Sequence, residues 1–142
     1  MKALLALPAA VLVALAAAVP ATADPGTGAA TPSYPPPYID HTEWMQWGGL
    51  ASLRVFPTPA GRAASRQPGT SAAADEAWAE VLASAPDAGT AGMRAQFLCH
   101  WQFAETAQPG KTSWNLEPWR PVVDDTEIVA AGCNPGGPEG PF

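Results

Sequence analysis

The segment KTSWNLEPWRP, residues 111–121, holds the side chains of this chain that are best suited to binding or catalysis. Glu117 precedes Arg120 by three residues. At this spacing the two can form an ion pair across a turn, or the carboxylate can be tuned for acid–base chemistry. Trp119 can stack on the neighbouring guanidinium or present a flat apolar surface to a ligand. Together with Asn115 and His100, these residues form the candidate binding surface.

The same residues support more than one class of function. A non-catalytic module would bind an extracellular polymer or protein through this surface, and this is the first hypothesis. A small secreted hydrolase acting on cell-wall polymers would use Glu117 as acid or base, with His100 or Asp125 assisting, because glycoside hydrolysis needs two carboxyl groups across the scissile bond. The carboxylates at 124, 125 and 127 also match an ordinary polar loop. A protease inhibitor would need a rigid exposed loop, and residues 57–69 carry no specific mark of one.

Other chemistries lack their sequence signatures. The chain contains no G-x-S-x-G, H-E-x-x-H or C-x-x-C spacing, no phosphate-binding glycine loop and no dinucleotide fingerprint. A zinc site would need three or four converging ligands. We therefore expect no cofactor and no metal, and we expect His41 and His100 at the surface or at a sheet edge.

The first 23 residues match a secretory signal peptide. Lys2 precedes an apolar run over residues 3–19, and the sequence PATA at 20–23 ends in a small-x-small cleavage signal. A single membrane anchor is the alternative, but the run is short for a span and contains Pro8. We therefore expect cleavage after Ala23 and a secreted product, extracellular or associated with the cell wall, with no membrane segment.

The charge balance argues against nucleic acid as a partner. The chain carries 13 Asp and Glu against 7 Lys and Arg, for a net charge of −6, and has no basic run. Binding to phosphate backbones needs clustered Lys and Arg. The expected partner is therefore an extracellular polymer or a protein, and the oligomeric state is left open.

Cys99 and Cys133 are the two cysteines of the chain. In an exported protein, a disulfide between them is the natural interpretation, while two free thiols or a metal pair are the alternative. A bridge closing a loop of about 35 residues contributes roughly 3–4 kcal/mol in chain-entropy estimates. For a domain this small, that increment is a large share of the stability.

Composition divides the rest of the chain into three parts. Residues 24–38, rich in proline and poor in large aliphatic side chains, predict a disordered spacer. Residues 39–135 predict a single globular domain, and residues 136–142 a flexible tail.

The domain opens with a predicted β-hairpin around Gly48-Gly49, a pair that suits a two-residue turn. The turn fixes a register in which an opposite-charge pair and two Trp–Leu pairs lie across from each other. The expected pairs are Trp47–Leu50, Trp44–Leu53, Thr42–Val55 and Glu43–Arg54. Pro57 and Pro59 end the second strand.

A polar loop is expected over residues 60–69, followed by a helix from Thr70 or Ser71 to Pro86. Apolar residues recur along this helix at a spacing that predicts a face toward the core. They are Trp78, Val81, Leu82 and Ala85.

Three further strands are expected. Alternation over residues 93–105 indicates a strand that is firmest from Cys99 onward, although a short helix over 91–98 also fits. A strand over 112–117 would place Trp114 and Leu116 in the core and turn Asn115 and Glu117 to the other face. Residues 126–133 give another strand. The fold class is therefore α+β, with an antiparallel or mixed sheet of four to five strands and one or two helices on one face.

Four motifs occur in a specific order behind the signal peptide. They are SLRVFPTPAGR at 52–62, MRAQFLCHWQFA at 93–104, SWNLEPWRP at 113–121 and CNP at 133–135. This arrangement resembles the domain-of-unknown-function family numbered 2599, which consists of exported bacterial proteins, mainly from actinomycetes. The resemblance spans roughly residues 40–135. It implies that Cys99 and Cys133 belong to the framework of the domain, and it assigns no catalytic residue.

Overall fold

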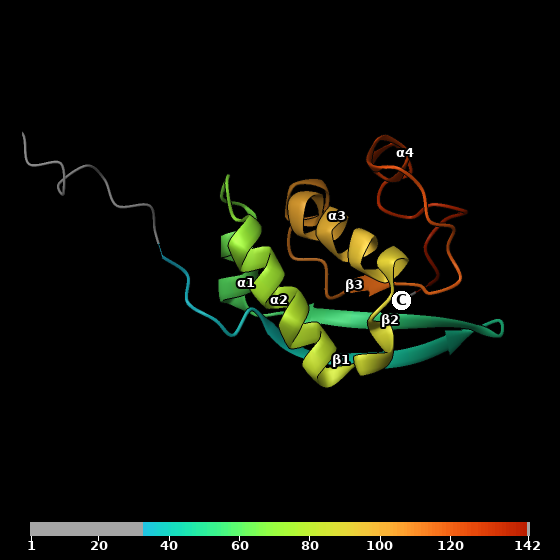
Figure 1. Ribbon diagram of the computed structural model, residues 1–142, viewed down its shortest axis with the longest axis horizontal. Helices are drawn as coiled ribbons and strands as arrows, with labels where there is room; N and C mark the ends of the chain where they lie inside the picture. The colour runs from blue at the N-terminus through green and yellow to red at the C-terminus, as the bar shows by residue number, and fades with distance from the viewer. Residues whose placement is uncertain (1–32, 142) are drawn as a thin grey trace, which may run out of the picture. The chain divides into compact units, whose positions relative to one another are not determined.

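The computed structural model describes residues 33–141 as an α+β domain built on a three-stranded antiparallel sheet in the order β1-β2-β3 (Figure 1). The strands are β1 (Ile39–Trp47), β2 (Leu50–Pro57) and β3 (Trp114–Leu116). The α-helices are α1 (Pro59–Ser65), α2 (Ser71–Ser84), α3 (Ala91–Ala107) and α4 (Asp125–Ala130), and a 3-10 turn, η1 (Pro86–Ala88), follows α2. The α+β class is confirmed.

The hairpin formed by β1 and β2 has the predicted register. Trp47 lies opposite Leu50 and Glu43 opposite Arg54, and the other two predicted pairs are also present. Gly48 and Gly49 both have positive φ, at 56° and 79°, which a two-residue turn between twisted strands requires. The turn residues and the hydrophobic pattern were therefore sufficient to specify this part of the fold.

The prediction of four to five strands was wrong, because two expected strands are largely helical within residues 33–141. Residues 93–105 belong to α3, and residues 126–130 belong to α4. The Thr90 hydroxyl caps α3 by accepting from the Met93 amide at 3.2 Å, and the Asp124 carboxylate caps α4 by accepting from Glu127 at 2.8 Å. Side-chain caps of this kind satisfy amides that a helix start would leave unpaired.

The polar loop expected over residues 60–69 is also wrong in its first half, which is α1. Thr58 caps this helix by accepting from the Gly61 amide at 2.9 Å, and Pro59 occupies the first turn, where a missing amide hydrogen costs nothing. The predicted helix over 70–86 is confirmed as α2. Its expected core stripe is buried at Trp78, Val81 and Ala85 and half-buried at Leu82.

The main core lies between the sheet and helices α1, α2 and α3, which pack on one face of it (Figure 1). Trp114 and Leu116 are fully buried there, as the alternation in β3 predicted. Phe97 is the centre of an aromatic group, with ring centroids 5.4–6.3 Å from those of Trp78, Trp101 and Trp114. Aromatic pairs at such distances add to the free energy gained from burial alone.

The main chain of Glu117, the residue that follows β3, is paired by a single side chain. The Gln96 amide group of α3 donates to the Glu117 carbonyl at 2.9 Å and accepts from the Glu117 amide at 2.8 Å. These two bonds reproduce the exchange that a neighbouring strand would make. Buried Gln96 therefore satisfies the main-chain amide and carbonyl of buried Glu117.

A disulfide joins Cys99 of α3 to Cys133, the residue pairing predicted from the sequence. The two cysteines pack with Ile128 of α4 in a small second core. Because α4 has only six residues, this bridge and cluster are its principal attachment to the rest of the domain.

Two sequence predictions fall on the N-terminal part of the chain. The signal peptide, residues 1–23, and most of the spacer lie outside the described residues. At the end of the spacer, Tyr38 is buried, and the Glu80 carboxylate accepts from the Tyr38 and Ile39 amides at 2.8 and 2.7 Å. Between residues 33 and 141, no helix has both the length and the apolar character needed to cross a bilayer.

Candidate functional site

The sheet face opposite the helices carries the polar residues of the motif SWNLEPWRP. Alternation turns Asn115 and Glu117 to this face, beside Ser52 and Arg54 of β2. The structure buries Asn115, Glu117 and Arg120 almost completely, at 0, 2 and 4 % exposure. The sequence grouped these residues correctly, but it gave no sign that they are covered.

Glu117 and Arg120 form a buried ion pair. One Glu117 carboxylate oxygen accepts from Arg120 Nε at 2.8 Å and the other from the Ser52 hydroxyl at 3.0 Å. Of the two roles considered for this carboxylate, the structure thus shows the ion pair across a turn. Charge-assisted bonds of this type are strong because little water competes for either partner.

The cover over this polar face is the C-terminal segment, residues 135–141. The Arg120 guanidinium donates to the main-chain carbonyls of Pro135, Gly137 and Pro138 at 2.6–3.3 Å. Asn115 donates to the Glu139 carboxylate at 2.7 Å, and Lys111 also pairs with Glu139. The sequence expectation of a flexible tail from residue 136 does not anticipate these bonds.

Trp119 is the one member of the candidate surface that is exposed, at 38 %. The centroid of its ring lies 4.4 Å from the Arg120 guanidinium carbon, so the stacking considered from the sequence is present. The rest of the ring borders a pocket of about 290 Å³ together with Trp47 and Leu50 of the hairpin. Ser52, Glu117 and Glu139 add polar groups to the lining. We call this the aromatic pocket.

His100 lies elsewhere and is buried, at 4 % exposure, so its expected place at the surface or sheet edge is wrong. It lines a second pocket, of about 240 Å³, with Lys111, Asn134 and Glu139. We call this the histidine pocket. Burial lowers the pKa of His100 below its usual value of 6.5, and the nearby Lys111 ammonium acts in the same direction. The imidazole is therefore neutral at physiological pH.

The burial of His100 predicts a pH-dependent stability. Below about pH 6.5 the unfolded chain binds a proton at this histidine while the folded chain does not. The free energy of unfolding is therefore highest, with respect to His100, above that pH, and it decreases as the pH falls. Between pH 7.5 and 5.5, His100→Gln should flatten this fall by up to about 1.4 kcal/mol per pH unit, the limit for one proton. Urea unfolding at a series of pH values measures the slope.

His41 provides the matched control, because it is exposed and stacks on Phe56 with ring centroids 4.0 Å apart. His41→Gln keeps His100 and should therefore keep the fall in stability between pH 7.5 and 5.5. Equal slopes for His100→Gln and the natural chain would contradict the prediction.

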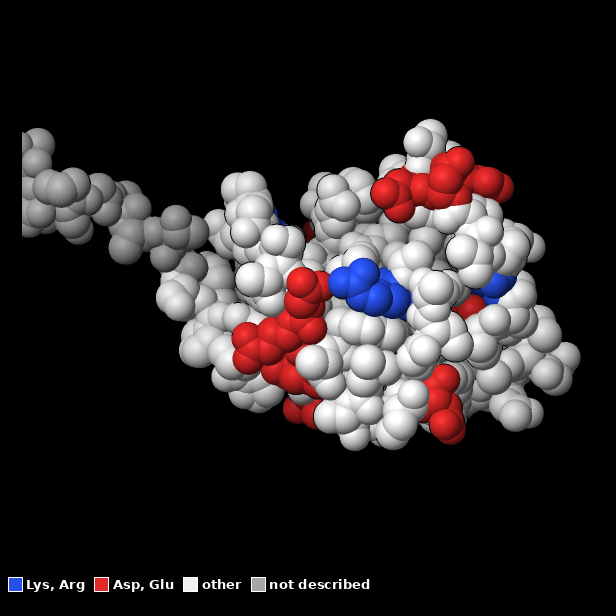
Figure 2. Space-filling model, viewed as in Figure 1, with Lys and Arg blue, Asp and Glu red and all other residues white. Residues whose placement is uncertain are grey.

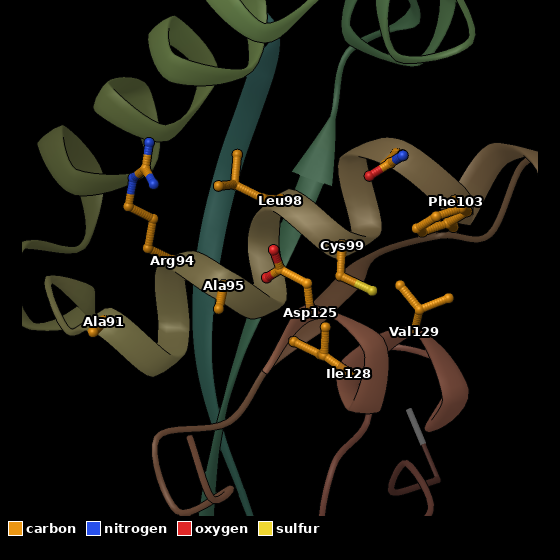
Figure 3. A pocket seen from close by; sticks show the side chains of 10 residues that line it. Ala91, Arg94, Ala95, Leu98, Cys99, Phe103, Asp125, Ile128 and Val129 are labelled. Carbon is orange, nitrogen blue, oxygen red and sulfur yellow. The ribbon is translucent and has the colours of Figure 1, made fainter. Parts of the chain in front are cut away.

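Asp125 lies in a third pocket, of about 450 Å³, between α3 and α4 (Figure 3). The walls are mostly apolar and include Cys99, Ile128 and Val129. In Figure 3 the Asp125 side chain points toward α3, whereas Arg94 points away from α4. Arg94 pairs instead with Asp75 of α2 at 2.8 Å.

The structure does not bring the residues of the hydrolase hypothesis into one pocket. Glu117 lines the aromatic pocket, His100 the histidine pocket and Asp125 the third. Within residues 33–141, no three His, Cys, Asp or Glu side chains are grouped so as to hold a metal ion.

Several residues of these pockets were missed in the sequence. Trp47 and Leu50 were recognised only as a cross-strand pair, although a hairpin tip that carries large apolar side chains is itself a signal of an exposed surface. Glu139 lines both the aromatic and the histidine pockets. As the one charged residue of the C-terminal segment, it was the available clue that this segment has a partner.

The charge distribution agrees with an acidic protein. Figure 2 shows Asp and Glu gathered over α2 and near α4, with only small, separate groups of Lys and Arg on this face. Buried Arg120 and the paired Arg62 are not available to form a basic surface: Arg62 Nη1 lies 2.5 Å from Glu105.

These features define a small α+β domain in which one disulfide secures the last helix and a C-terminal segment covers the polar face of the sheet. The chain belongs to the family described as protein of unknown function DUF2599, whose model matches residues 39–136. The resemblance noted in the motifs is confirmed.

Similar proteins occur in mycobacteria. Uncharacterised proteins of Mycobacterium bovis and Mycobacterium tuberculosis are each 62 % identical over 149 residues, covering all of both chains. An uncharacterised protein of Mycobacterium leprae is 57 % identical over 110 residues, covering 78 % of this chain and 89 % of its own. No solved structure matches the chain.

Proposed function

We propose that the protein is a secreted, non-catalytic binding module that holds a polysaccharide of the cell envelope in its aromatic pocket. The observation that carries this proposal is the exposure of large apolar side chains around one polar opening. Trp47 is 59 % exposed, Leu50 46 % and Trp119 38 %. Exposed apolar groups that gather around polar ones mark interaction sites more often than isolated surface residues do.

The chemistry of the lining favours sugar rings. A sugar presents C–H groups on its faces, which pack on tryptophan, and hydroxyl groups at its rim, which donate to carboxylates. The pocket offers both kinds of partner, with tryptophans at its border and Glu117 and Glu139 in its lining. Each carboxylate oxygen accepts more than one hydrogen bond, so the existing bonds of Glu117 leave capacity for a ligand.

Export is part of the same proposal. The signal-peptide pattern of residues 1–23 supports it, and a disulfide between the two cysteines suits an oxidising compartment. Within the described residues, the hydrolase hypothesis has no such support, because its proposed residues line separate pockets.

Co-sedimentation tests the proposal. The mature chain, residues 24–142, is mixed with isolated bacterial cell walls and with insoluble polysaccharides, and the supernatants are assayed for released sugars and peptides. We expect pelleting without release, and we expect Trp47→Ala and Trp119→Ala each to weaken binding roughly tenfold or more, as for a central interface residue.

Trp44→Ala is the matched control. Trp44 is 42 % exposed and lies on the same hairpin, but it faces the helix side of the sheet, opposite Leu53. Its removal should leave pelleting unchanged. Equal losses from all three variants, or no pelleting with any polysaccharide, would contradict the proposal; capture by wall protein alone would indicate a protein partner. Release of sugars would support the hydrolase.

A further inference from the structure

The histidine pocket has two contrasting walls. Apolar side chains of α3 and α4 form one part of it, including Phe103, Ala104, Ala107 and Val129. Polar side chains form the rest, among them His100 and Asn134. The volume of about 240 Å³ is enough for a small organic molecule and larger than a single water needs.

In the described part of the chain, one ring nitrogen of His100 is hydrogen-bonded and the other is not. Its Nδ1 lies 2.8 Å from the Gln96 carbonyl oxygen. A carbonyl oxygen only accepts, so Nδ1 must carry the hydrogen and Nε2 must carry the lone pair of the neutral ring. Among residues 33–141, no donor is hydrogen-bonded to Nε2, although His100 is only 4 % exposed.

The side chain of Asn134 provides a second acceptor that has no hydrogen-bond donor in the part of the chain that the structure describes. Its amide nitrogen donates to the Gly132 carbonyl at 3.2 Å. Its side-chain oxygen is buried and has no hydrogen-bond partner within the described residues. A buried polar atom left in this state costs about 1–3 kcal/mol, so a donor that reached it would be stabilised.

The charges in the pocket are already balanced. The Lys111 ammonium is paired with the Glu139 carboxylate, and the imidazole is neutral because burial lowers the pKa of His100. A charged ligand would therefore lose its hydration without gaining a new counterion. Lys111 has a third N–H hydrogen beyond the two directed to Glu139, and it can donate to a ligand oxygen.

We propose that the histidine pocket binds a small neutral primary amide with an apolar body. The NH₂ group would donate to His100 Nε2 and to the side-chain oxygen of Asn134, the amide oxygen would accept from Lys111, and the apolar body would pack beside Phe103 and Val129. The proposal does not rest on polysaccharide binding, since Trp47 and Trp119 do not line this pocket and Glu139 is the shared residue.

Nuclear magnetic resonance of the ¹⁵N-labelled protein tests this with benzamide as the probe. Methyl benzoate is the matched control, because it keeps the ring and the carbonyl but has no N–H donor. We expect benzamide to shift the His100 Nε2 resonance and the Asn134 amide signals, and to bind at least about tenfold more tightly than methyl benzoate, since the ester has no N–H to donate to His100 Nε2 or to the Asn134 oxygen.

Asn134→Ala should reduce the difference between the two probes, and Trp119→Ala should leave both affinities unchanged. Asn134 is only half-buried, so this variant should fold; if it does not, the two probes on the natural chain still decide the question. Equal affinities for benzamide and methyl benzoate, or no response at His100, would overturn the proposal and leave a pocket filled by water. Failure of the cell-wall assay would not affect this result.

Discussion

Replacing Arg120 by Met is expected to lower the free energy of unfolding by about 3–5 kcal/mol, the range found when one partner of a buried ion pair is removed. The Arg120 side chain is 0 % exposed and that of Glu117 3 %, so the carboxylate would be left charged and buried without its counterion. The three carbonyls of the C-terminal segment would lose their donor as well. Urea unfolding followed by tryptophan fluorescence measures the change.

Two further variants show whether the effect comes from this geometry. Arg120→Lys keeps the charge but cannot reach the carboxylate and the carbonyls with one planar group, so an intermediate loss is expected. Arg66→Met removes an arginine that is 50 % exposed and whose partner, Glu105, retains Arg62, so the loss should be about 1 kcal/mol or less. If Arg66→Met cost as much as Arg120→Met, burial would not be the cause.

The second large effect is expected from the disulfide. The double substitution of Cys99 and Cys133 by Ala should lower stability by roughly 3–4 kcal/mol, because the bridge closes a loop with a sequence separation of 34. For a domain of this size, the melting temperature should fall by on the order of 10 °C or more. Calorimetry measures the fall directly.

The loss should be uneven along the chain. The bridge and Ile128 form the small core that fastens α4, so amide hydrogen exchange should accelerate first over residues 125–133. Reductant should lower the melting temperature of the natural chain and leave that of the double variant unchanged. An unchanged melting temperature in reductant would show that the bridge does not stabilise the fold.

Local sequence signals predicted the hairpin, α2 and β3 well. In each, one strong signal coincided with the tertiary environment: the Gly-Gly turn, the helical spacing around Trp78, and the alternation of Trp114 and Leu116. The disulfide was also predictable, because a chain with two cysteines offers one pairing.

The two strands predicted over residues 93–105 and 126–133 were wrong because the sequence pattern there reflects tertiary packing and not the period of a strand. Helix α3 is buried on several sides, with Phe97 against the core, His100 toward the C-terminal segment and Cys99 toward α4. Such a helix has no single polar face, and its sequence can alternate by chance. In α4 the capping Asp124 was visible in the sequence, but the apolar run that follows was too short to show helical spacing.

The grouping of Asn115, Glu117 and Arg120 was predictable from the sequence, but their burial was not, and His100 lies in a separate pocket. The spacing of Glu117 and Arg120 indicated their contact, and the alternation of β3 placed Asn115 beside them. Their burial depends on residues 135–141, which have the composition of a flexible tail. Nothing local in a proline- and glycine-rich sequence reveals that an arginine elsewhere binds its carbonyls.

Arg120 binds the C-terminal segment, residues 135–141, through main-chain carbonyls, and this affects which residues can be substituted there. Every residue type has a main-chain carbonyl, so these contacts do not themselves select a residue type. Proline offers this acceptor although it has no amide hydrogen to donate. The family match ends at residue 136, whereas the contacts extend to Gly137 and Pro138. Pro138 can therefore be replaced with its carbonyl contact kept, whereas Gly137 has a φ of 148°, which residues with a side chain rarely adopt. Replacing Glu139 would remove a bond made by its side chain.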